Sequence, residues 1–101
     1  MERPPALPAR LPVALVAVDA ARGVHRRWQV AVTRDLFGYW LVERAWGRIG
    51  AGGRTRIDSF VDADAAHAHA RRLLARRAGA RRRIGVAYLP VDMSTGRVVD
   101  M

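Results

Sequence analysis

The chain has 101 residues, half of them hydrophobic, which is enough for one domain with a single covered sheet but not for two domains. It contains no cysteine, which excludes disulfides and thiolate metal sites, and no apolar run approaches the roughly 18 residues of a membrane span. The formal net charge of +9 is carried by arginine without any lysine, and it predicts a polyanionic partner, with nucleic acid favoured over an anionic membrane.

The first ordered element is expected after a proline-rich start. Residues 1–12 carry four of the five prolines and show no periodicity, which predicts a flexible arm. Val13 to Val18 is a β-branched apolar run, and Asp19 and Gly23 follow it. This pattern predicts a first strand with a turn behind it.

Two further strands are predicted on either side of a turn at Asp35 to Gly38. Trp28 to Val32 alternates, with one face made of Trp28, Val30 and Val32 and the other of Gln29, Ala31 and Thr33. That alternation is typical of a half-buried strand. Tyr39 to Trp46 is apolar on both sides near its start, so the sequence leaves open which face of Trp40 and Val42 lies inside.

A glycine-rich connection predicts the next hairpin. Gly50 to Gly53 can adopt the positive φ values that tight turns need, because glycine has no Cβ. Arg54 to Val61 then returns as a fourth strand.

One long helix is predicted from Asp62 to about Ala78. Asp62 is a suitable N-cap and Gly79 a natural C-cap. On a helical wheel the apolar face consists of Ala63, Ala66, Ala70, Leu73 and Leu74. Arg77 falls on the same side, where its stem can follow the core while its head reaches water.

The C-terminal part completes a predicted α+β domain. Ile84 to Val91 predicts a fifth strand, and residues 93–101 form a tail. The domain would span residues 13–92, with about five antiparallel strands and one α-helix on one face, between strands 4 and 5.

A distinctive tripeptide, Trp46-Gly47-Arg48, lies where the third strand passes into the glycine turn. An indole beside a guanidinium at a strand end suits a sugar and a phosphate. The tripeptide and its surroundings resemble the WGR domain, a module named after these three residues. The likeness covers roughly Val16 to Tyr88, and its other parts are His25 to Trp28, Leu36 to Val42 and Gly50 to Phe60.

The resemblance implies the order of elements given above and a contact with nucleic acid. In DNA-dependent poly(ADP-ribose) polymerases the module helps to grip the end of a broken DNA strand, and many short bacterial proteins of unassigned role also carry it. The chain departs from the family pattern twice. His25 stands where the family often has asparagine, and Arg81 to Gly85 separates the helix end from Tyr88, which would match the family's aromatic residue.

The candidate contact residues surround the tripeptide. Trp46 would pack on a sugar or base and Arg48 would bind phosphate, whereas a core tryptophan and a solvated arginine are the alternative that the resemblance disfavours. Gly47 suits a turn or a close backbone approach. The remaining candidates for nucleic-acid contact are His25, Arg26, Arg27, Arg44 and Tyr88.

No enzyme is indicated by the sequence. The serines lack a His-Asp arrangement, the glycine turn is not a P-loop, and His67 and His69 point apart on a helix, so neither a metal nor another cofactor is expected. We therefore expect a soluble cytoplasmic binding module for nucleic acid, with DNA favoured over RNA. The alternative is a protein–protein interaction module that uses a sheet edge or the motif surface.

Overall fold

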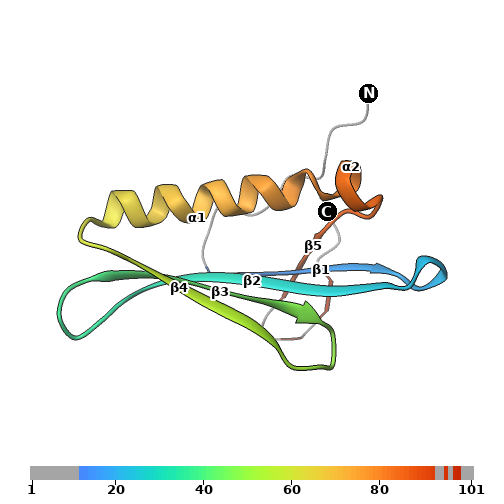
Figure 1. Ribbon diagram of the computed structural model, residues 1–101, viewed down its shortest axis with the longest axis horizontal. Coiled ribbons are helices and arrows are strands. Elements are labelled where there is room, and N and C mark those ends of the chain that lie inside the picture. The colour runs from blue at the N-terminus through green and yellow to red at the C-terminus, as the bar shows by residue number, and fades with distance from the viewer. Residues whose placement is uncertain (1–11, 93–94, 96, 99–101) are drawn as a thin grey trace.

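The computed structural model describes residues 12–92, 95 and 97–98, which form an antiparallel sheet crossed on one face by a long helix (Figure 1). The strands of the sheet lie in the order β4-β3-β2-β1-β5. In chain order the elements are β1 (Val13–Asp19), the 3-10 turn η1 (Ala20–Arg22), β2 (Val24–Arg34), β3 (Trp40–Arg48), β4 (Gly53–Phe60), α1 (Ala63–Ala78), α2 (Ala80–Ile84) and β5 (Leu89–Val91). The predicted α+β fold, with its main helix between strands 4 and 5, is confirmed.

The second strand is longer than its alternation predicts. β2 begins at Val24 rather than Trp28, so the polar residues His25, Arg26 and Arg27 lie within the strand. They are extended because β2 pairs with β1 from Val24 onward and with β3 from Arg26 onward. The ladder of backbone hydrogen bonds, and not the alternation of side chains, sets the length of this strand.

The strand register settles which face of β3 lies inside. Trp28 stands directly across from Leu15 of β1 and from Trp46 of β3. Residues directly across from each other in a sheet project from the same face. Trp40, Val42 and Trp46 therefore share the face of Trp28, which is the face that packs against α1.

The helix α1 packs on the sheet through the apolar face that the sequence predicts. Asp62 caps it by accepting a hydrogen bond from the backbone N–H of Asp64 at 3.3 Å. The residues that α1 buries against the sheet are Ala66, Ala70, Leu73 and Leu74. Because alanine side chains are small, the helix can lie close to the sheet, and both alanines are fully buried.

The predicted fifth strand is wrong in its first part. Ala80–Ile84 forms the short helix α2, and only Leu89–Val91 is paired as β5, against Ala14 to Val16 of β1. Gly85 adopts φ +77°, which interrupts an extended run. The residues before Gly85 follow α1 almost directly, and the alanine and arginines among them favour a helix.

The predicted arm and tail lie largely outside the described residues. Residues 1–11 of the proline-rich arm lie outside the described residues, as do 93–94, 96 and 99–101 of the tail. Within the described tail, Val98 forms a β-bridge with Val91, and the Asp92 N–H donates to the Arg97 carbonyl at 2.8 Å. Part of the tail thus folds back on β5.

Candidate nucleic-acid interface

The tripeptide forms the last three residues of β3. Trp46 is half-buried and packs against the core, whereas Arg48 is exposed on the same face. Gly47 faces the other side and pairs with Gly53 of β4. A Cβ on Gly47 would lie 2.9 Å from the Gly53 Cα, so glycine is needed for the two strands to close at the hairpin.

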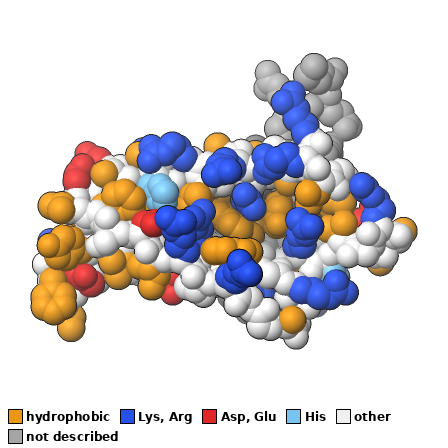
Figure 2. Space-filling model, in the orientation of Figure 1, with side chains coloured by type: hydrophobic (Ala, Val, Ile, Leu, Met, Phe, Trp, Pro, Cys, Tyr) orange, Lys and Arg blue, Asp and Glu red, His pale blue; other side chains and the backbone are white. Residues whose placement is uncertain are grey.

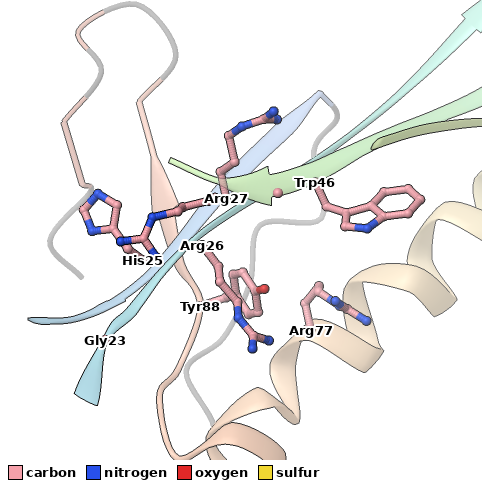
Figure 3. A pocket seen from close by; sticks show the side chains of 9 residues that line it. Gly23, His25, Arg26, Arg27, Trp46, Arg77 and Tyr88 are labelled. Atoms are coloured by element: carbon pink, nitrogen blue, oxygen red, sulfur yellow. The ribbon is translucent and has the colours of Figure 1, made fainter. Parts of the chain in front are cut away.

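A groove opens at this end of the sheet, between the strands and the C-terminal part of α1 (Figure 3). We call it the tripeptide groove, and its volume is about 430 Å³. Its lining residues are Gly23, His25, Arg26, Arg27, Trp46, Gly47, Arg48, Arg77 and Tyr88. The structure thus brings every predicted contact residue except Arg44 to one place.

Strand alternation divides these residues between two sides. Arg26 lies directly across from Arg48, and both project from the face that α1 covers. Figure 3 shows Arg26 beside Tyr88 below the strands, whereas Arg27 points the opposite way. Arg27 donates a hydrogen bond to the Ala51 carbonyl at 3.4 Å, so its side chain braces the hairpin.

Backbone contacts and burial distinguish two other predicted residues. The His25 carbonyl accepts a hydrogen bond from the Ile49 N–H at 3.0 Å, which ties β2 to the residue that follows the tripeptide. The Tyr88 ring is buried, with only 6% of the residue exposed, and it forms part of the groove wall. Tyr88 therefore exposes less surface to the groove than the half-buried Trp46 and the exposed Arg48 do.

The arginines of this groove have few counter-charges. Arg26 and Arg48 are both exposed, and like charges directly across a strand pair are destabilising. Neither forms an ion pair with any carboxylate among the described residues. Asp58, which lies outside this groove, pairs instead with Arg56 at 3.3 Å and with His69 at 3.1 Å. An anion in the groove would relieve the repulsion.

Arg77 is half-buried, with its Nε–H out of contact with solvent and its guanidinium against two aromatic rings. Its guanidinium carbon lies 5.5 Å from the centre of the Trp28 ring and 5.8 Å from that of Tyr88. Burial lowers the pKa of Arg77, as does the charge of Arg83, while Tyr88 raises it. The guanidinium nevertheless stays charged in a protein. Stacking on aromatic rings therefore holds a cation in the groove wall.

A second groove, which we call the helix groove, lies next to the first and measures about 280 Å³. Its lining residues are Trp28, Arg44, Trp46, Arg56, Arg76 and Arg77. Trp46 and Arg77 line both grooves. Sequence reasoning missed Arg56, Arg76 and Arg77, because their approach to Trp46 depends on the strand register and on the packing of α1.

The surface reflects this arrangement. Figure 2 shows arginine side chains gathered around exposed apolar surface between α1 and the sheet, with most acidic side chains toward the left of the view.

Over the residues that the structure describes, no helix is both long and apolar enough to cross a membrane. Nor do three or more His, Cys, Asp or Glu side chains come together there as a metal site.

The fold and the two grooves define a small basic α+β domain with an aromatic, arginine-lined surface. The family profile described as the WGR domain matches residues 11–82. The chain therefore belongs to the WGR domain family. The match ends before Tyr88, so the aromatic residue aligned by resemblance lies outside it. No match was found among curated protein sequences or among solved structures.

Proposed function

We propose that the protein binds nucleic acid through the sugar-phosphate backbone, without catalysis, and that it prefers DNA ends or nicks. The observation that carries this proposal is the pair of Arg26 and Arg48. They face each other beside the half-exposed indole of Trp46 and have no carboxylate partner among the described residues. Membership of the WGR family supports DNA as the nucleic acid.

The chemistry of the tripeptide groove fits a strand terminus. Arg48 and Arg26 can each donate two parallel hydrogen bonds to a phosphate, and Arg77 supplies a third positive charge from α1. Trp46 is held on one side by the core, so its free surface can pack on a sugar or base without losing much freedom. The groove lies at the end of β3, where a terminal phosphate can enter.

A binding titration tests this function. The ligands are a nicked duplex with a 5′-phosphate, an intact duplex, a single strand and an RNA duplex, each at two salt concentrations. We expect the nicked, phosphorylated duplex to bind tightest. Equal affinity for intact and nicked duplex would reject the preference for ends, and no binding to any of the four ligands would reject the function.

A protein–protein interaction module is the second candidate. The face of the sheet opposite α1 carries no helix in the described part of the chain, and β4 leaves one edge unpaired (Figure 1). Ile57 of that strand is 54% exposed. A protein bound there would form a complex that changes little with salt, unlike a complex driven by phosphates.

A further inference from the structure

The helix groove gathers positive charge from three elements. Arg44 belongs to β3, Arg56 to β4, and Arg76 and Arg77 to α1. Arg44 and Arg56 stand directly across from each other on the covered face of the sheet, where like charges repel. Of these four arginines, only Arg56 pairs with a carboxylate among the described residues. That carboxylate belongs to Asp58, which also pairs with His69.

The aromatic floor of this groove holds two of the guanidinium groups in place. Arg44 lies over the Trp46 ring, with its guanidinium carbon 5.6 Å from the ring centre, and Arg77 lies over Trp28. A guanidinium that lies over an aromatic ring keeps its positive charge and its N–H donors.

Each of these two arginines also has one buried N–H group without an acceptor among the described residues. The Nε–H groups of Arg44 and Arg77 are out of contact with solvent and have no hydrogen-bond partner within the described part of the chain. A buried donor without an acceptor is costly. Such a concentration of donors and positive charge, with one shared carboxylate, matches a site whose acceptor arrives with a ligand.

We propose that the helix groove is a second phosphate subsite, which takes a further backbone phosphate of the strand whose end lies in the tripeptide groove. This proposal rests on the proposed function. Trp46 and Arg77 line both grooves, so a strand that passes over Trp46 enters the second groove directly. The ligand is therefore a strand with several consecutive phosphates, and a single nucleotide fills only the first subsite.

Arginine side-chain NMR separates the two subsites. The Nε–H signals of the labelled protein are followed while a deoxynucleoside 5′-monophosphate, and then a 5′-phosphorylated octanucleotide, is added. The nucleotide should move the Arg26 and Arg48 signals. The octanucleotide should also move those of Arg44 and Arg56, which line the helix groove but not the tripeptide groove.

The alternative outcomes have different meanings. If the octanucleotide moves only the Arg26 and Arg48 signals, the second subsite is rejected while the proposed function stands. If no arginine signal responds to either ligand, both proposals are rejected. Movement of the helix-groove signals alone would overturn the continuous path across Trp46.

A matched pair of variants on one helix gives an independent test. Arg76 and Arg72 are both exposed on α1, but only Arg76 lines the helix groove. Arg76→Gln should weaken octanucleotide binding about fivefold and lower the salt slope by about 1, with little effect on the mononucleotide. Arg72→Gln removes the same charge and should change binding less than twofold. Equal losses in the two variants would mean that net charge alone matters, and would overturn the subsite.

Discussion

Trp46 belongs both to the edge of the core and to the proposed binding surface. It packs against the core, and it also lines both grooves. Trp46→Ala should therefore lower the free energy of unfolding by about 1.5 to 3 kcal/mol, less than for a fully buried tryptophan, because part of the indole is already exposed. It should also lose roughly 1 to 3 kcal/mol of binding free energy.

Urea unfolding and DNA titrations on Trp46→Ala measure the two effects separately. Trp46→Phe is the companion variant, because it keeps an aromatic ring in the same place and should recover most of the stability. Normal DNA binding by a folded but less stable Trp46→Ala would show that the indole serves the core alone.

Arg48 is exposed and has no ion pair in the described part of the chain, so its contribution should be confined to binding. Arg48→Ala should change the free energy of unfolding by less than about 0.5 kcal/mol. Loss of its phosphate contact should cost on the order of 1.5 to 3 kcal/mol of binding free energy. A thermal melt and a titration against nicked DNA check both values, and an Arg48→Ala protein that binds like the original would exclude Arg48 from the interface.

Gly47 is needed for packing of the backbone. A methyl group there would lie 2.9 Å from the Gly53 Cα and 3.3 Å from the Gly52 carbonyl oxygen. Gly47→Ala should lower the free energy of unfolding by about 1 to 3 kcal/mol, measured in urea. Gly52→Ala is the matched control, since nothing lies within 4 Å of its added Cβ. Equal stability of the two variants would show that the hairpin can relax around a side chain.

At the scale of elements, Asp58 links β4 to α1. It accepts hydrogen bonds from His69 of α1 and from Arg56 of its own strand. Burial raises the pKa of Asp58, but the hydrogen bond from His69 and the charge of Arg56 outweigh it and hold the pKa below the usual value. The Asp58 carboxylate thus connects α1 to the sheet beside Arg56.

The pH dependence of stability follows from this lowered pKa. Since the folded-state pKa lies below the unfolded value of about 3.9, the carboxylate stabilises the fold above that value and loses its effect as the pH falls through the folded pKa. The free energy of unfolding of the unmodified protein should therefore exceed that of Asp58→Asn at pH 6, and the two should converge toward pH 2. A difference that persists unchanged at low pH would contradict the assigned role.

At the scale of the whole molecule, the face in Figure 2 carries arginine side chains between α1 and the sheet, whereas its acidic side chains lie mostly toward the left of the view. If three to five phosphates are neutralised, log K should fall with log salt at a slope of roughly −3 to −4.5. Binding should also tolerate changes of base sequence, because phosphate contacts carry no base identity. Titrations of one nicked duplex over a range of salt concentrations measure the slope, and a flat profile or a strong preference for one sequence would contradict phosphate-driven binding.

The sequence by itself determined most of the secondary structure and the centre of the site. Alternation from Trp28 to Val32 and the caps at Asp62 and Gly79 are local signals, so they predicted elements that the structure confirms. The tripeptide was recognisable because its three residues are adjacent in the chain. The failure at Ile84 to Tyr88, where a strand was predicted, has a local cause too, since a short apolar run does not by itself settle the secondary structure.

Only the tertiary structure decided how residues distant in sequence meet. Strand register places Arg26 across from Arg48 and Arg44 across from Arg56, and a shift by one residue would turn these side chains to the opposite face. The packing of α1 on the sheet brings Arg77 over Trp28 and so creates the second groove. Spacing along the chain predicts how residues alternate within one strand or helix, but the distance between elements depends on how their apolar faces pack in the core.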